Sequence, residues 1–227
     1  MKRGVPIIMI EIKNLCFSYN NSRPYLIDDL SLEIEKSSYV SIVGSNGSCK
    51  STLIKLMLNL LIPQKGSIHL NSKKVGYVPQ IVENFNSSFP ITVWEVLNTH
   101  RKTMKLSDKE CITEALEKVG MLEYKNSLIG NLSGGQKQKV FIARAILADI
   151  DILILDEPST GVDSTSMKEI YSIITKLNKD NKVTVLSIEH NIEIAIANSS
   201  HILTMNNGEG SLYTVDDYLR RLSDVSI

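Results

Sequence analysis

The chain has 227 residues, and its 25 Lys and Arg side chains balance its 25 Asp and Glu side chains. A hydrophobic fraction of 43% and a charged fraction of 22% are typical of a globular protein and exclude general disorder. The balanced charge argues against a nucleic-acid binder that works through an overall basic field. Three widely spaced cysteines exclude a disulfide framework and a structural zinc site.

Membrane-spanning and targeting signals are not expected. The longest apolar runs, at residues 56–62 and 150–155, are far shorter than the roughly 20 residues that a spanning helix needs. The N-terminal apolar stretch runs directly into the charged residues 11–13, with no small-residue cleavage site. We therefore expect neither a signal peptide nor a membrane anchor.

The first elements in chain order are strands. Apolar and polar residues alternate at 7–13 and 30–35, which predicts half-buried strands of an antiparallel flap. A short apolar run at 39–43 ends in glycine, and good helix formers follow at 51–62. This order predicts a strand, a glycine-rich loop and a helix.

Helical patterns then dominate the middle of the chain. We expect helices at 93–103, 108–119 and 135–147, a strand at 150–155, a helix at 166–177, a strand at 183–188 and a helix at 191–198. Turn signals at 71–72 and 206–208 separate further short strands. Strands that alternate with helices indicate an α/β fold with a parallel sheet covered on both faces, and a helical block is inserted at about 90–148.

The first candidate site is the loop Gly-Ser-Asn-Gly-Ser-Cys-Lys-Ser at residues 44–51, close to the phosphate-binding pattern G-x-x-x-x-G-K-[ST]. Such a loop surrounds phosphate oxygens with backbone N–H groups and directs the positive end of a helix at them. Lys50 would bring its charge to the terminal phosphates, and the Ser51 hydroxyl would ligate Mg²⁺. Cys49 stands where the pattern has glycine, so a glycine- and serine-rich turn with a chance lysine remains an alternative.

The second candidate site follows the strand at 150–155, where Asp156 and Glu157 are adjacent. Ligands bind beyond the carboxyl ends of parallel strands. Successive strand residues point to opposite sides, so the two carboxylates have different roles. We expect Asp156 to hold Mg²⁺ and Glu157 to polarise the water that attacks the γ-phosphate. A helix cap ahead of Pro158 is the alternative.

The third candidate site is Leu-Ser-Gly-Gly-Gln at residues 132–136, directly before a predicted helix, where a helix start can hold an anion. Alone, this segment is equally compatible with an ordinary N-cap followed by flexible glycines. Together with the two sites above, it closely resembles the signature of the nucleotide-binding subunits of ATP-binding-cassette (ABC) transporters. The resemblance covers nearly the whole chain.

That resemblance implies an ABC-type P-loop NTPase fold, with a mainly parallel core, an antiparallel β flap and an inserted helical subdomain. Residues 1–227 would form a single ABC ATPase domain. Its RecA-like core would comprise about 1–90 and 149–227, and its helical signature subdomain about 91–148.

Further family motifs follow in the expected order. Tyr19 matches the aromatic residue that stacks on adenine, and Gln80 matches the glutamine that links the Mg²⁺ and water site to the permease. Asp163 matches the segment that communicates across the dimer, and His190 matches the switch histidine that contacts the γ-phosphate. A strand tyrosine, a solvated loop glutamine and a helix cap remain the ordinary alternatives for the first three.

The resemblance assigns residues to three roles, with ATP and Mg²⁺ as cofactors. The catalytic residues would be Lys50, Glu157 and His190. The Mg²⁺ ligands would be Ser51, Gln80 and Asp156. The ATP-binding residues would be Tyr19, Gly44, Ser45, Asn46, Gly47, Ser48, Cys49, Lys50, Ser51, Thr52, Gln80, Leu132, Ser133, Gly134, Gly135, Gln136 and Asp163.

The resemblance also implies partners. In this family the signature of one subunit completes the ATP site of the other, so we expect a head-to-tail homodimer that encloses two ATP molecules. We further expect an integral membrane permease, an indirect link to a solute-binding protein and no nucleic acid. The chain would be cytoplasmic and peripheral on the inner face of the membrane.

Several phrases, at residues 75–80, 89–96 and 156–163, are similar to those of zinc- and manganese-uptake ATPases. We therefore expect an ATP-hydrolysing subunit that energises a metal-ion importer. Three alternatives stay open: a non-transport ABC ATPase of the cofactor-assembly type, an ABC ATPase for a different substrate, and a degenerate cassette that binds ATP as a structural partner.

Two finer expectations concern particular residues. A left-handed conformation at Cys49 would cost roughly 1–2 kcal/mol and weaken ATP binding, and Lys50 together with the helix start would favour a reactive thiolate there. The segment 81–94, with the apolar residues Phe85, Phe89 and Trp94, is predicted to contact the permease.

Overall fold

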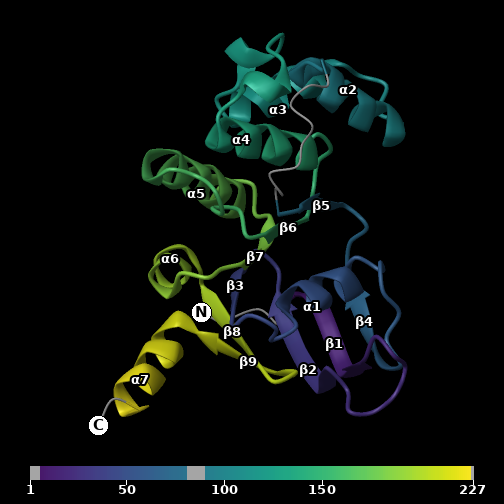
Figure 1. The fold of residues 1–227 in the computed structure, drawn as a ribbon, viewed down its shortest axis with the longest axis vertical. Helices are drawn as coiled ribbons and strands as arrows, with labels where there is room; N and C mark the ends of the chain where they lie inside the picture. The colour runs from purple at the N-terminus through teal and green to yellow at the C-terminus, as the bar shows by residue number, and fades with distance from the viewer. Residues whose placement is uncertain (1–5, 81–89, 226–227) are drawn as a thin grey trace. The chain divides into compact units, whose positions relative to one another are not determined.

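The structure is a computed structural model that describes residues 6–80 and 90–225 (Figure 1). The chain forms two compact units. The first unit comprises Met1–Lys73 and Lys182–Ile227, and the second comprises Lys74–Asn181. The predicted helical block at 91–148 lies within the second unit.

The first unit contains an antiparallel sheet of three strands in the order β2-β1-β4. These strands are β1 (Ile8–Phe17), β2 (Ile27–Glu35) and β4 (Lys65–Leu70). β2 alternates buried and exposed residues along most of its length, which is the pattern of a sheet with one face on the core. The predicted antiparallel flap is therefore confirmed, with longer strands than the alternation alone indicated.

The same unit contains a second group of strands in the order β7-β3-β8-β9. They are β3 (Tyr39–Val43), β7 (Thr184–Ile188), β8 (His201–Asn206) and β9 (Glu209–Thr214). The first three are parallel, and β9 pairs antiparallel with β8. Every residue of β3 and β7 is buried, as expected for parallel strands covered on both faces.

Helix α1 (Lys50–Met57) is shorter than the helix predicted at 51–62. Asn59 adopts a left-handed φ of 55°. Its N–H donates to the carbonyl of Leu56, and the N–H of Leu60 donates to the carbonyl of Lys55. This pair of bonds is a Schellman motif, which ends a helix although apolar residues continue beyond it.

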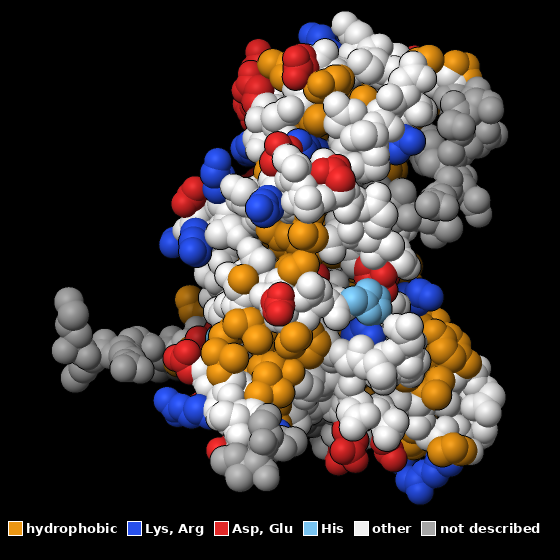
Figure 2. All heavy atoms as spheres, turned by 60° about the vertical axis from the view of Figure 1, so that its left-hand side comes forward, with side chains coloured by type: hydrophobic (Ala, Val, Ile, Leu, Met, Phe, Trp, Pro, Cys, Tyr) orange, Lys and Arg blue, Asp and Glu red, His pale blue; other side chains and the backbone are white. Residues whose placement is uncertain are grey.

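Helices α6 (Ile192–Asn198) and α7 (Val215–Val225) complete the first unit. Val215 and Tyr218 of α7 pack with α6 against a small buried cluster that includes Val43. Hydrophobic side chains gather on the surface over α6 and α7 in Figure 2, and on α7 this includes the exposed Leu219. The sequence patterns had indicated no helix at α7.

The second unit pairs β5 (Val75–Val78) with β6 (Ile152–Asp156) in parallel and surrounds this pair with helices. The helices are α2 (Val93–Thr103), α3 (Glu110–Lys118), α4 (Gly134–Ala145) and α5 (Ser164–Lys179), joined by the 3₁₀ turns η1 (Leu122–Tyr124) and η2 (Ile129–Asn131). Figure 1 shows α4 between α5 on one side and α2 and α3 on the other, and α4 contacts all three. The helices predicted in this stretch are confirmed to within two residues at each end.

Among the described helices, none has both the length and the apolar character that crossing a lipid bilayer requires.

Candidate active site

In the first unit, the loop between β3 and α1 is packed tightly against β8. A Cβ atom on Gly44 would lie 2.2 Å from the carbonyl oxygen of Met205 and 2.6 Å from Oγ of Ser48. Only glycine fits at this point, because backbone cannot yield to a clash of that size. The close packing against β8 therefore restricts the backbone path of the loop.

Lys50 folds back over this loop. Its side chain is buried, and Nζ donates to the carbonyl oxygens of Gly44 and Ser45, both at 2.9 Å. Buried ammonium groups are costly unless they are paired, so the two carbonyls hold the charge in place. The lysine that the motif predicts thus lies at the centre of the loop.

The loop offers further donors for an anion. Oγ of Ser48 is buried and has no hydrogen-bond partner within the described part of the chain. The first N–H groups of α1 have no carbonyl partner inside the helix, because no turn precedes them. Unsatisfied donors, a helix start and an ammonium group together fit a phosphate chain.

Cys49 adopts φ 71° and ψ 18°, which is the left-handed conformation whose cost the sequence analysis considered. The reactive thiolate expected at Cys49 is not supported. Burial raises the pKa of the Cys49 thiol, and the neighbouring Lys50 only partly opposes that effect. The sequence shows the adjacent charge but not the burial, which is the larger cause.

Tyr19 lies beside the start of α1. Its hydroxyl is 3.1 Å from Oγ1 of Thr52, and its ring packs edge-to-face on Phe17 with centroids 5.1 Å apart. The side chain is 58% exposed. A fixed aromatic ring with an open face next to a phosphate loop suits stacking on a purine base.

His190 is exposed and lies two residues beyond the end of β7. β7 is parallel to β3, and the N–H of Glu189 donates to the carbonyl of Ile42 at 3.0 Å. His190 and the phosphate loop therefore lie at the same edge of the sheet, where ligands of such folds bind. Glu189, which the sequence analysis did not single out, is buried and accepts a hydrogen bond from Oγ of Ser187 at 2.5 Å.

In the second unit, Asp156 ends β6 and is buried, while Glu157 is half-buried with a left-handed φ of 53°. Nε2 of Gln80 donates to Oε2 of Glu157 at 2.6 Å. Oγ1 of Thr160 donates to the same oxygen at 3.0 Å. The structure thus brings Gln80 and Glu157 together and adds Thr160, to which the sequence analysis gave no role.

The buried carboxylate of Asp156 also affects its surroundings. Burial raises the pKa of Tyr77, and the negative charge of Asp156 raises it further. Tyr77 belongs to β5, which pairs with β6. Asp156 therefore presents its charge close to the end of this strand pair.

The signature segment forms the start of α4. Oγ of Ser133 accepts from the N–H of Gln136 at 3.2 Å, and Oε1 of Gln136 accepts from the N–H of Ser133 at 2.9 Å. This reciprocal pair is a capping box. The N-cap role considered for Ser133 is thus confirmed, and it leaves the N–H groups of Gly134 and Gly135 at the helix start.

The glycines of this segment allow a close approach to α5. A Cβ on Gly135 would lie 2.3 Å from Cβ of Ser166. Asp163 caps α5, since its Oδ1 accepts from the N–H groups of Thr165 and Ser166, both at 3.0 Å. Hydrogen bonds from Ser166 and Thr165 lower the pKa of Asp163. The helix-cap role weighed for Asp163 is confirmed.

The surface expected to contact the permease falls mostly outside the described residues, because these omit 81–89 and with them Phe85 and Phe89. Trp94 is described. It is half-buried at the start of α2, with Nζ of Lys125 6.0 Å from its ring centroid.

Comparison with known proteins now identifies the class. The family model described as "ABC transporter" matches residues 27–160, more than half of the chain. An ATP-binding protein of Treponema pallidum (strain Nichols), named for a metal transport system, is 42% identical over 94% of this chain and 90% of that protein. The zinc uptake system ATP-binding protein ZurA of Listeria innocua is 36% identical over 93% of this chain and 89% of that protein. The chain belongs to the ABC transporter family.

Solved structures agree. The dimeric bacterial ABC transporter cassette MJ0796 is 25% identical with a TM-score of 0.77, covering 91% of this chain and 99% of that chain. A nucleotide-free cassette from another ABC transporter has a TM-score of 0.82 at 21% identity and supports the fold alone, covering 96% of each chain. The ABC-type α/β fold and the ATP-binding ATPase class expected from the motifs are confirmed.

Proposed function

We propose that this chain is the ATP-hydrolysing subunit of a membrane importer for a metal ion, zinc or manganese. The observation that carries the proposal is its similarity, over most of its length, to ATP-binding proteins named for zinc uptake in Listeria innocua and for high-affinity zinc uptake in Bacillus subtilis. The phosphate loop, over which Lys50 is held by two backbone carbonyls, supports ATP binding as part of that role. The metal ion is the cargo of the permease and is no ligand of this chain.

The proposed work of ATP hydrolysis is divided among several residues, each assigned by the family pattern. Lys50 offsets negative charge on the terminal phosphates, and Tyr19 stacks on the adenine. Glu157 polarises the attacking water and accepts its proton, and His190 contacts the γ-phosphate. Gln80 links this site to the permease.

Mg²⁺ would be held by Ser51, Gln80 and Asp156. A hydroxyl, an amide oxygen and a carboxylate are hard oxygen donors, the set that Mg²⁺ prefers. The side chains present therefore fit this ion. When bound, the ion would neutralise negative charge on the terminal phosphates.

The remaining ATP contacts are proposed from the family pattern. They comprise the rest of the phosphate loop (Gly44, Ser45, Asn46, Gly47, Ser48, Cys49 and Thr52) and, from the partner subunit, the segment 132–136 with Asp163. Such sharing makes a head-to-tail homodimer the active form. The dimer would dock on the inner face of a membrane permease, and the permease would receive its cargo from a solute-binding protein, with no nucleic acid involved.

The test is uptake of radioactive zinc and manganese by cells that lack this gene, complemented with the wild-type chain or with the Lys50→Ala variant. We expect the wild-type chain alone to restore uptake of one of the two ions at nanomolar supply. Uptake of both ions at the wild-type rate in the uncomplemented cells would overturn the proposal. If the Lys50→Ala variant also restored uptake, transport would not depend on ATP hydrolysis by this chain, and the proposal would be overturned.

A further inference from the structure

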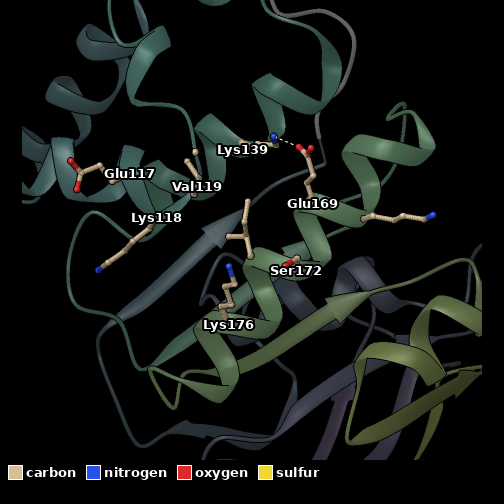
Figure 3. A pocket seen from close by; sticks show the side chains of 10 residues that line it. Glu117, Lys118, Val119, Lys139, Glu169, Ser172 and Lys176 are labelled. Atoms are coloured by element: carbon tan, nitrogen blue, oxygen red, sulfur yellow. Dashed lines mark hydrogen bonds and ion pairs between the residues drawn. The ribbon is translucent and has the colours of Figure 1, made fainter.

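A cavity is formed entirely by residues of the second unit. It has a volume of about 590 Å³ and lies where the end of α3, the middle of α4 and one face of α5 meet (Figure 3). Its size falls within the range of about 300–1,000 Å³ that is usual for small-molecule sites. None of the residues that line it belongs to the nucleotide motifs.

One wall is a regular row on α5. Lys168, Ser172 and Lys176 follow one another at intervals of four residues, so they share one face of the helix. At 1.5 Å per residue the row is about 12 Å long. It presents two ammonium groups with a hydroxyl between them.

The opposite wall is the end of α3. Figure 3 shows Glu117, Lys118 and Val119 across the cavity from Ser172 and Lys176. The third side is Lys139 of α4, which forms an ion pair with Glu169 of α5, drawn as a dashed line. Lysine residues from all three helices therefore line the cavity.

These charges do not cancel. The Lys139 ammonium is matched by Glu169. The ammonium groups of Lys118, Lys168 and Lys176 have no ion pair or hydrogen bond within the described part of the chain, and the carboxylate of Glu117 is the one lining acid not already paired there. Three ammonium groups against one carboxylate give the cavity a net positive charge, which attracts an anion.

The side chains that line the cavity limit the chemical classes of ligand that it can bind. Lysine acts as a compact point charge and suits a phosphate, whereas arginine provides the planar fork that suits a carboxylate. The lining has no arginine. Val119 is buried and Ile173 half-buried, so the cavity also offers apolar surface to the body of a small molecule.

We propose that this cavity binds a small phosphorylated metabolite with at least two phosphate groups, one facing Lys118 and the other the Lys168–Lys176 row. An anion in the cavity competes with Glu169 for Lys139. Because Lys139 belongs to the helix that begins with the signature, binding is expected to change the rate of ATP hydrolysis. The cavity would then act as a regulatory site.

The test uses the full chain with its nucleotide site saturated by Mg-ADP, and fructose 1,6-bisphosphate as the probe in isothermal titration calorimetry. The test variant is Lys118→Gln with Lys176→Gln. The matched control is Lys36→Gln with Lys73→Gln, two exposed lysines of the first unit that lose the same charge. We expect saturable binding by the wild-type chain, at least about tenfold weaker binding by the test variant and unchanged binding by the control.

Absence of saturable binding by the folded wild-type chain would overturn the proposal, and so would equal weakening in test and control variants. Hexaglutamate is titrated in parallel. Tighter, lysine-dependent binding of this peptide than of the bisphosphate would assign the cavity to an acidic protein segment and overturn the metabolite assignment. Lys168→Gln alone provides an independent variant, with matching thermal midpoints as the check on folding.

Discussion

Two neighbours hold the carboxylate of Glu157 in place, the amide of Gln80 at 2.6 Å and the hydroxyl of Thr160 at 3.0 Å. Glu157→Gln keeps the size and shape of the side chain but removes the negative charge that polarises water. We expect ATP turnover to fall at least ~10²-fold. Phosphate release under saturating Mg-ATP measures this loss, and near-normal release would remove Glu157 from the catalytic role.

Thr160 provides a finer test of the same group. A hydrogen bond to a charged group contributes about 1.5–3 kcal/mol, so Thr160→Val is expected to lower kcat by roughly tenfold through misplacement of Glu157. Thr160→Ser retains the hydroxyl and should retain most of the activity. The KM for ATP should stay within about twofold in both variants. Equal activity of the valine and serine variants would show that the Thr160 hydroxyl is dispensable.

The thiol of Cys49 gives a prediction that depends on pH. Burial raises its pKa, so the protonated, unreactive form predominates at neutral pH. The fraction of reactive thiolate increases only at pH values above the ordinary range for a cysteine. We expect slow alkylation by iodoacetamide at pH 7 and a rate that climbs through pH 9. Mass spectrometry of tryptic peptides, with Cys49→Ser as control, assigns the modified residue. A rate that levels off below pH 8 would contradict the raised pKa.

At the residue scale, the motifs identified the charged residues of the candidate site but not the contacts and the burial of their side chains. The order of motifs was enough to select Gln80 and Glu157, which the structure joins by a hydrogen bond. The role of Thr160 was not predicted, because nothing in the sequence shows that its hydroxyl contacts Glu157. The thiol of Cys49 was misjudged for a related reason: its charged neighbour is visible in the sequence, whereas its burial arises from the fold.

At the scale of elements, α4 shows how the signature segment combines two tasks. Ser133 caps the helix through its capping box, and removal of such a cap costs about 1 kcal/mol. Ser133→Ala is therefore expected to lower the free energy of unfolding by that amount in urea, while Ser133→Asn preserves the cap. If both variants lose ATPase activity to the same degree, the Ser133 hydroxyl also contacts nucleotide; an alanine variant as stable as wild type would contradict the capping role.

Periodicity predicted the existence of most elements and failed at particular ends. The helix at α1 stops early because Asn59 takes the left-handed conformation, although the apolar residues Leu60 and Ile62 suggest continuation. Helix α7 has charges at five of its 11 positions, and its two packing residues, Val215 and Tyr218, are too few to give a clear pattern. Its start is instead fixed locally, because Oγ1 of Thr214 accepts from the N–H of Asp217 at 3.2 Å.

At the scale of the whole molecule, the proposed head-to-tail homodimer leads to a prediction that tests two chains together. If the phosphate loop of one subunit works with the signature of the other, then Lys50→Ala and Ser133→Glu each inactivate both sites of their own homodimer. In a mixed dimer the two lesions fall on the same site, and the other site is intact. Symmetric pairing makes half of the dimers mixed, so an equal mixture should recover about a quarter of wild-type activity.

The measurement is ATP hydrolysis after the two inactive variants are combined, dissociated by dilution and concentrated again. Recovered activity should rise with total protein concentration, because only the dimer contains complete sites. A mixture of Lys50→Ala with Glu157→Gln serves as the control: both changes affect residues that serve the nucleotide on their own subunit, so every site in any dimer carries one lesion. Activity in that control would show that Lys50 and Glu157 serve different sites. No activity in the Lys50→Ala and Ser133→Glu mixture would refute the head-to-tail arrangement.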